Sequence, residues 1–139
     1  LFSLQSKLLT QQHKMVVKKV LLVEDNPVIL ISLEFLMKQN GYDVLTADND
    51  VDALNLAEMH LPDLIMLDVM LNSSSGYEIC KTLRTRKNLA HTKIILLSAL
   101  GQTEDIEKGV EAGADLYVTK PFSTRDLVKT VKEMLADEE

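Results

Sequence analysis

The chain has 139 residues, of which 46% are hydrophobic and 26% are charged, so it fits one globular domain rather than a disordered polymer. Its formal net charge of −6 argues against a general binder of nucleic acid or of anionic membranes, and no apolar run approaches the roughly 18 residues needed to span a bilayer. The single cysteine, Cys80, excludes an intrachain disulfide, so we expect a buried thiol and a reducing, cytoplasmic location.

The first 14 residues begin without a methionine, whereas Met15 opens the first strand-like pattern. Lys7 and Lys14 bracket no long apolar stretch, so this segment is not a signal peptide. We interpret residues 1–14 as a leader or other non-native extension, and residues 15–139 as the native domain.

Strand-like and helix-like patterns alternate from Val16 onward. Asn26 and Pro27 suit the start of a helix, and Gly41 and Gly113 suit helix ends. The patterns predict strands at 16–23, 42–47, 64–68, 93–98 and 116–119, separated or followed by helices at 27–40, 50–60, 77–86, 103–112 and from about 123 to 136.

Strands with apolar centres that alternate with helices are typical of a parallel sheet covered on both faces. Right-handed crossovers leave few ways to wind such a sheet. We therefore predict an α/β fold with a single doubly wound five-stranded parallel sheet, in the order 2-1-3-4-5, with helices on both faces in the flavodoxin-like manner.

Polar side chains stand at the carboxyl ends of four predicted strands. Glu24 and Asp25 follow the first strand, Asp68 ends the third, Ser98 ends the fourth and Lys120 follows the fifth. Each aspartate alone is about as often a solvated turn residue or a helix cap as a functional residue. Lys120 alone is usually a solvated lysine, and Ser98 alone is usually a loop hydroxyl. Because open α/β sheets bind ligands at these strand ends, we expect the five side chains to converge.

Three neighbouring carboxylates repel one another, and a hard, oxygen-liganded cation relieves that repulsion. A cation, a lysine and a hydroxyl also form a site for a phosphoryl group, and an aspartate carboxylate can be the nucleophile that accepts one. The pattern therefore predicts Mg²⁺ (or Mn²⁺) beside a phosphorylated aspartate.

Four segments at the strand ends carry a family resemblance. They are VEDNP at 23–27, PDLIMLD at 62–68, LSA at 97–99 and ADLYVTKPF at 114–122. In this order they resemble the response-regulator receiver domains of two-component and phosphorelay signalling, in particular the stand-alone chemotaxis-type and cell-fate-type regulators. The resemblance implies a domain that takes a phosphoryl group from a histidine kinase or a histidine phosphotransferase and then changes its contacts with a downstream protein. It implies no direct contact with nucleic acid or membrane, and no enzymatic activity beyond the domain's own phosphorylation and dephosphorylation.

The resemblance also assigns the metal ligands. Asp25 and Asp68 would bind Mg²⁺, Glu24 would act mainly through water, and the backbone carbonyl of Met70 would be a further ligand.

The same resemblance assigns the phosphoryl site and the switch. Asp68 would be the phosphoacceptor, and Lys120 and Ser98 would bind the phosphoryl oxygens. Tyr117 would change rotamer in response, and the peptide bond between Lys120 and Pro121 would be cis.

Two departures from the family pattern follow the phosphoacceptor. Asn72 stands where a proline is common, and three serines at 73–75 precede Gly76, which puts the rigidity and the partner contacts of this loop in question. Met70 and Leu100 occupy the positions that flank the attacking water in relatives. Because neither apolar side chain can orient water, we hypothesise slow self-dephosphorylation.

The first predicted helix is apolar on more than one face, which a single core stripe does not require. We interpret it as a helix well buried between neighbours; the alternative is an exposed surface for a histidine-bearing partner. The apolar residues are Val28, Ile29, Leu30, Ile31, Leu33, Phe35, Leu36 and Met37.

Three functions stay open from the residues alone. The first is a stand-alone receiver, which the end of the chain after its last helix favours; the second is a receiver taken from a longer kinase or transcription factor. The third is a metal-dependent phosphatase or a nucleotide- or flavin-binding module, since fold does not fix function. No phosphate-binding glycine motif or second catalytic acid supports the third.

Overall fold

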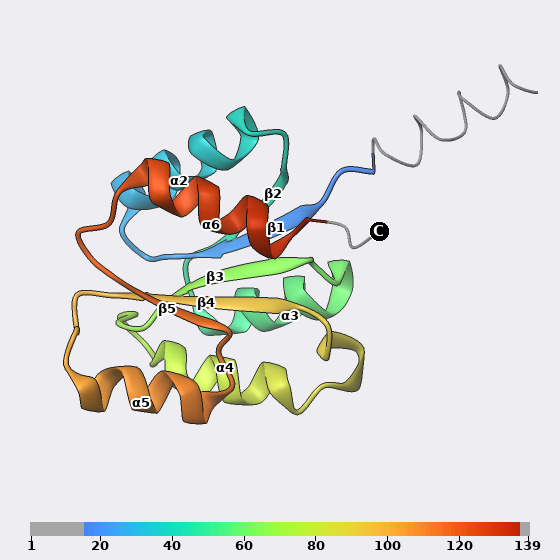
Figure 1. Ribbon diagram of the computed structural model, residues 1–139. Helices are drawn as coiled ribbons and strands as arrows, with labels where there is room; N and C mark the ends of the chain where they lie inside the picture. The colour runs from blue at the N-terminus through green and yellow to red at the C-terminus, as the bar shows by residue number, and fades with distance from the viewer. Residues whose placement is uncertain (1–15, 137–139) are drawn as a thin grey trace, which may run out of the picture.

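The structure is a computed structural model that describes residues 16–136 (Figure 1), so the predicted leader lies outside the described residues. Within them, strands and α-helices alternate regularly, as predicted. The strands are β1 Lys19–Val23, β2 Asp43–Ala47, β3 Leu64–Asp68, β4 Lys93–Ser98 and β5 Leu116–Thr119. The helices are α2 Pro27–Gln39, α3 Asp50–His60, α4 Gly76–Arg84, α5 Thr103–Ala112 and α6 Thr124–Met134, with a 3-10 turn, η1 Lys87–Leu89, before β4.

The five strands form one sheet in the order β2-β1-β3-β4-β5, and every neighbouring pair is parallel. This confirms the predicted fold class. The register pairs Val23 with Leu67 and Asp68 with Leu97, so the strand ends that carry the predicted site lie along one edge of the sheet.

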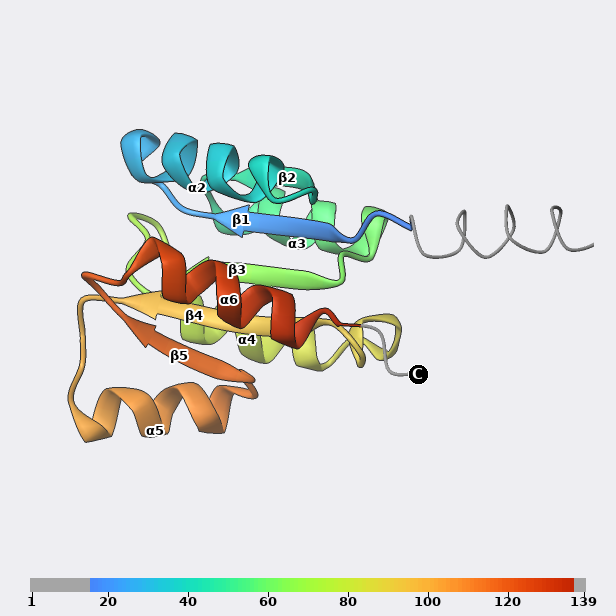
Figure 2. The ribbon, with the colours of Figure 1, turned by 45° about the horizontal axis from the view of Figure 1, so that its top comes forward.

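The sheet lies between two layers of helices (Figures 1 and 2), and an apolar cluster fills the space on each of its faces. Alternate strand residues such as Leu21 and Ile65 pack with α3, α4 and α5, whereas their neighbours such as Leu22 and Met66 pack with α2 and α6. Because successive strand side chains point to opposite faces, continuous apolar strands are what a doubly covered sheet requires.

Local signals set the ends of most helices. The Asn26 side chain accepts hydrogen bonds from the Val28 and Ile29 N–H groups at 3.0 and 3.3 Å, and Pro27 begins α2. Gly41, at φ +89°, follows α2 in the left-handed conformation that glycine adopts without strain.

Several predicted boundaries are wrong by a few residues. β1 begins at Lys19 rather than at 16, because Lys19 pairs with Asp43, the first residue of β2. The helix predicted to run to 86 ends at Arg84, and the last helix ends at Met134 rather than at 136. Helix ends fray, so such differences of about two residues are ordinary.

The preferred interpretation of the first helix is wrong as well. Only Leu33 and Met37 of α2 are buried, whereas Val28, Ile31 and Phe35 are 72, 65 and 65% exposed. These three side chains form a solvent-facing apolar surface, here called the α2 surface. Helix α2 packs on the sheet with one face, and no other element of residues 16–136 covers the other.

Candidate functional site

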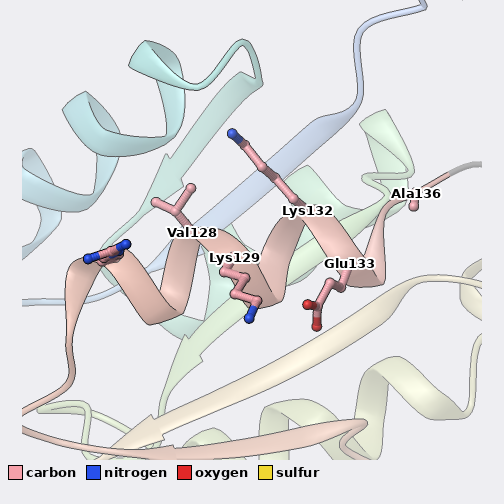
Figure 3. Close-up of a pocket in the computed structure, with 6 residues that line it drawn as sticks. Val128, Lys129, Lys132, Glu133 and Ala136 are labelled. Atoms are coloured by element: carbon pink, nitrogen blue, oxygen red, sulfur yellow. The ribbon is translucent and has the colours of Figure 1, made fainter.

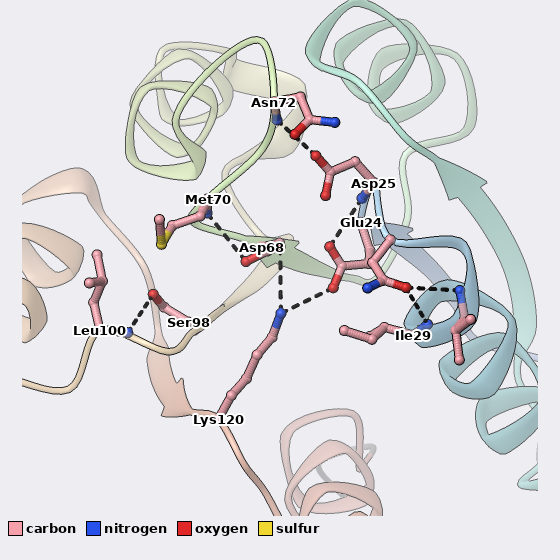
Figure 4. Close-up of polar contacts among 11 residues, drawn as sticks. Glu24, Asp25, Ile29, Asp68, Met70, Asn72, Ser98, Leu100 and Lys120 are labelled. Atoms are coloured by element: carbon pink, nitrogen blue, oxygen red, sulfur yellow. Dashed lines mark hydrogen bonds and ion pairs between the residues drawn. The ribbon is translucent and has the colours of Figure 1, made fainter.

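The carboxyl edge of the sheet brings together the three acids predicted from the sequence. Carboxylate oxygens of Glu24, Asp25 and Asp68 all lie within 4.8 Å of one another (Figure 4). Glu24 and Asp68 are only 2 and 5% exposed, because each directly ends or follows a central strand. A cluster of this kind is unfavourable unless positive charge compensates it.

Lys120 supplies part of that positive charge. Its ammonium nitrogen lies 3.0 Å from Glu24 Oε1 and 3.5 Å from Asp68 Oδ2 (Figure 4). The Lys120 N–H donates to the Ser98 carbonyl at 2.8 Å, and the following peptide bond to Pro121 is cis. Backbone contacts therefore fix the point from which the long Lys120 side chain reaches the acids.

One ammonium group neutralises at most one of the three carboxylates. Burial raises the pKa of Glu24, a hydrogen bond with Asp68 raises it further, and the hydrogen bond from Lys120 lowers it. The remaining negative charge and the hard oxygen donors fit a divalent cation such as Mg²⁺, which binds through one or two carboxylates. The residues present therefore suit the cofactor predicted from the sequence.

Backbone amides hold two of the acids in place. The Asn72 N–H donates to Asp25 Oδ2 at 2.8 Å, and the Met70 N–H donates to Asp68 Oδ1 at 3.3 Å (Figure 4). The contact from Asn72 was not predicted, because a backbone donor leaves no trace in residue type. The loop closes through a bridge between Met70 and Ser75.

Ser98 is fully buried at the end of β4, and its Oγ accepts a hydrogen bond from the Leu100 N–H at 3.0 Å. The hydroxyl hydrogen of Ser98 stays available to a second acceptor. Tyr117 lies nearby on β5, and its hydroxyl donates to the Leu100 carbonyl at 2.6 Å. Leu100 thus connects the two predicted switch residues.

Another hollow lies on the outer surface of α6 (Figure 3). None of the predicted site residues lines it, and its charged side chains are exposed, so we assign it no function. Its lining residues are Arg125, Val128, Lys129, Lys132, Glu133 and Ala136.

The sequence matches the family described as "Response regulator receiver domain" over residues 20–132. The chain belongs to this family. It is therefore a receiver domain of two-component signalling, and receiver domains are phosphoacceptors rather than conventional enzymes. Within residues 16–136 no helix has both the length and the apolarity to cross a membrane.

A relative that is named as a transcriptional regulatory protein agrees with this assignment. The receiver domain is 44% identical over 118 residues to the alkaline phosphatase synthesis transcriptional regulatory protein PhoP of Bacillus subtilis (strain 168), covering 85% of this chain and 48% of PhoP. The chain thus spans about half the length of that relative.

Two solved structures share the fold. The BeF3-activated DrrB receiver domain is 37% identical, with a TM-score of 0.80 over 88% of this chain and 100% of its own. The receiver domain of the sensor histidine kinase PA1611 from Pseudomonas aeruginosa PAO1 is 30% identical, with a TM-score of 0.80 over 88% of this chain and 100% of its own. The PA1611 structure is described with a magnesium ion coordinated in the active site cleft.

Proposed function

We propose that this receiver domain accepts a phosphoryl group on Asp68 from a phosphohistidine of a kinase or phosphotransferase, in a Mg²⁺-dependent reaction in the cytoplasm, and then changes its contacts with a downstream protein. The observation that carries the proposal is the convergence of Asp68 with two further acids and Lys120 at one edge of the sheet. Neither a structural ion pair nor a helix cap requires three acids within 4.8 Å.

The transfer forms one bond and breaks one. A carboxylate oxygen of Asp68 attacks phosphorus, the bond between phosphorus and the donor imidazole nitrogen breaks, and that nitrogen keeps the electron pair. Lys120, 3.5 Å from Asp68, lies where it can pair with a phosphoryl oxygen. Glu24 then loses part of its share of the ammonium group, because both compete for the same donors.

Glu24, Asp25 and Asp68 are the side chains that would hold Mg²⁺, with the Met70 carbonyl as a further proposed ligand. When bound, the ion neutralises negative charge on the carboxylates and on the phosphoryl oxygens.

Switching is assigned to Ser98 and Tyr117. A phosphoryl group adds negative charge and acceptor oxygens at Asp68, and the Ser98 hydroxyl can donate to one of them. Because Leu100 contacts both Ser98 and Tyr117, a movement of Ser98 changes the surroundings of the Tyr117 hydroxyl. Pro121, which follows the cis bond, begins the segment that leads to α6 and is the third residue of the proposed switch.

The α2 surface is proposed as the docking face for the histidine-bearing donor. Val28 is the second residue of α2, just after the loop that carries Glu24 and Asp25, so a protein seated on Val28, Ile31 and Phe35 has the site within reach. Exposed apolar side chains clustered on one helix are typical of such contacts. The test is phosphotransfer from a histidine phosphotransferase to Phe35→Ser; transfer as fast as in wild type counts against this face.

The phosphoryl lifetime is proposed to be long. Met70 and Leu100 are 59 and 37% exposed beside the site, and neither can orient an attacking water. Replacing Met70 by glutamine and Leu100 by glutamate should shorten the half-life of the phosphorylated domain. An unchanged half-life contradicts the proposal.

Intact mass spectrometry tests the central proposal. Wild type and Asp68→Asn are incubated with acetyl phosphate or phosphoramidate, with and without Mg²⁺. We expect the mass to increase by one phosphoryl group only when both Mg²⁺ and Asp68 are present. A folded wild type that gains no phosphoryl group, or an Asp68→Asn variant that gains one, overturns it.

The role of Lys120 is tested separately with Lys120→Arg. The planar guanidinium group cannot replace a compact ammonium group at both acids, so we expect phosphorylation without normal switching. Normal phosphorylation-dependent binding of a partner by this variant contradicts the assignment.

A further inference from the structure

Two tyrosine hydroxyls meet beside the switch. The Tyr77 hydroxyl, from the first turn of α4, lies 3.3 Å from the Tyr117 hydroxyl on β5. Tyr117 also donates to the Leu100 carbonyl at 2.6 Å, and Tyr77 donates to the Asp105 carbonyl in the first turn of α5 at 3.0 Å. Burial raises the pKa of Tyr77, so its hydroxyl keeps its hydrogen at neutral pH.

The three contacts compete for two hydrogens, since each hydroxyl has one to donate. The Tyr77 hydroxyl can therefore donate its hydrogen either to the Asp105 carbonyl or to the Tyr117 hydroxyl oxygen, but not to both at once. When it donates to Tyr117, it strengthens the bond from Tyr117 to Leu100, because hydrogen bonds in a chain polarise one another.

Helix α5 leaves room for the Tyr117 ring at Gly109. A Cβ at Gly109 would lie 2.8 Å from Tyr117 Cδ2 and 3.3 Å from Leu96 Cδ1. Glycine is unfavourable inside a helix, so its presence here has a packing reason. The ring position seen in the structure thus depends on a hydroxyl partner in α4 and on a missing side chain in α5.

Tyr77 is also fixed relative to the phosphoacceptor. The preceding residue, Gly76, donates its N–H to the Val69 carbonyl at 2.8 Å, and a side chain at Gly76 would collide with the Asp68 carbonyl oxygen. The tyrosine pair therefore joins the loop after Asp68 to the loop after Ser98, on the side of the sheet that α4 and α5 cover.

We propose that Tyr77 is a positioning residue that holds Tyr117 on the Leu100 carbonyl and thereby keeps Ser98 placed to meet a phosphoryl group at Asp68. The proposal rests on the function proposed above and adds a residue that the family motifs do not include. Because coupling is reciprocal, occupancy of Asp68 should in turn stabilise the tyrosine pair.

The test uses beryllium fluoride as a mimic of the phosphoryl group, as in the BeF3-activated DrrB structure, in the presence of Mg²⁺. Calorimetry measures the apparent dissociation constant of beryllium fluoride. Tyr77→Phe removes one hydrogen bond, so we expect binding about 2- to 10-fold weaker than in wild type. Tyr42→Phe is the matched control, because Tyr42 precedes β2 at the opposite edge of the sheet, and its binding should equal that of wild type. Equal affinities for wild type and Tyr77→Phe overturn the proposal.

A double-mutant cycle separates positioning from general stability. In a Tyr117→Phe background the hydroxyl partner is absent, so adding Tyr77→Phe should weaken binding little further, although the Asp105 contact is still lost. The same loss in both backgrounds would mean that Tyr77 acts through Asp105 alone, which overturns the proposal.

Gly109→Ala tests the ring position without touching a hydroxyl. Alanine favours the helix, which offsets a similar cost of displacing the Tyr117 ring, so the thermal midpoint should change little. The displaced ring should weaken binding of beryllium fluoride. Unchanged affinity contradicts the inference. A wild type that neither binds beryllium fluoride nor gains a phosphoryl group overturns the proposed function and this inference together, whereas binding that is insensitive to Tyr77→Phe overturns the inference alone.

Discussion

At the carboxyl edge of the sheet one ammonium group pairs with two of three neighbouring carboxylates, whereas at the amino edge one guanidinium group is surrounded by acceptors. Arg84, in the last turn of α4, donates to the Gly113 carbonyl at 2.8 Å, to the Thr92 carbonyl at 2.8 Å and to Asp115 at 2.8 Å. Asp115 also accepts the Ile94 N–H at 2.8 Å. These partners lie just before β4 or β5, and a longer hydrogen bond joins Arg84 to the Leu89 carbonyl of η1 at 3.4 Å. Arg84 thus ties the starts of both strands to α4.

The contrast separates an edge where the charges are paired from an edge where they are not. Around Arg84 the charges are paired and the backbone carbonyls are satisfied. Around Asp68 the negative charge exceeds the positive charge, and burial makes the imbalance costly. Substitutions at the two edges should therefore affect folding in opposite directions.

The largest effect is expected at Arg84. Arg84→Ala leaves several acceptors without a donor, so the free energy of unfolding should fall by about 3 kcal/mol. Urea denaturation measures it. Arg86→Ala is the matched control, because Arg86 makes one exposed ion pair with Glu58 and should cost less than about 0.5 kcal/mol. Equal losses in the two variants would remove the distinction drawn for Arg84.

A smaller effect is expected where the backbone meets Arg84. Gly113 ends α5 at φ +96°, and a Cβ there would lie 2.7 Å from Arg84 Cγ. Gly41, at φ +89°, has nothing within 4 Å of the same position. Both glycine-to-alanine changes should lower the free energy of unfolding by about 1 kcal/mol through the backbone, and Gly113→Ala by about 1 kcal/mol more through the clash. A larger loss at Gly41 would contradict this ranking.

The next substitution is expected to stabilise the fold rather than destabilise it. Asp25→Asn removes a negative charge that has no ion pair in the described residues, so without Mg²⁺ the free energy of unfolding should rise by about 1 kcal/mol. Asp115→Asn makes the same chemical change at the other edge and should lower it, because it breaks the pair with Arg84. Urea denaturation measures the change in the free energy of unfolding for both variants. Changes of the same sign would contradict the difference between the two edges.

Addition of Mg²⁺ should distinguish Asp25→Asn from Asp115→Asn further. A ligand that binds only the folded state at ten times its dissociation constant adds about 1.4 kcal/mol of stability. Wild type and Asp115→Asn should gain this increment, whereas Asp25→Asn should gain little. A full gain in Asp25→Asn would show that Asp25 is not a ligand.

The smallest effect is expected in the labelling rate of Cys80, which lies buried in α4 between the two edges. Burial raises the pKa of its thiol to about 11, so iodoacetamide at pH 8 should react with it only through opening of the structure. The labelling rate should rise in Arg84→Ala and fall in metal-free Asp25→Asn. Rapid labelling of folded wild type would show local opening at α4 instead.

The sequence predicted the sheet because its signals are local. Apolar runs define the strands, and Asn26 and Gly113 define helix ends through their own backbone preferences. Once the strand order is known, the convergence of Glu24, Asp25 and Asp68 follows from their places at the strand ends.

Contacts between distant side chains were not predictable in this way. The exposure of Phe35 depends on which elements fail to cover α2, and an apolar pattern does not contain that information. Tyr77 meets Tyr117 across 40 residues, and Arg84 binds backbone carbonyls, which every residue carries. The turn η1 has only three residues, too few for a period to be detected.

The pair between Glu24 and Lys120 joins residues 96 positions apart, and Lys120 follows the last strand of the sheet. A chain emerging from the ribosome therefore presents all three acids long before the lysine that balances them. Even a nascent chain whose first four strands had paired would lack this cation at the carboxyl edge. If Lys120 binds the phosphoryl group as proposed, competence to receive a signal is acquired only once β5 and Lys120 have been synthesised, so a nascent chain that stops before Lys120 should not compete with mature copies for the donor's phosphoryl group.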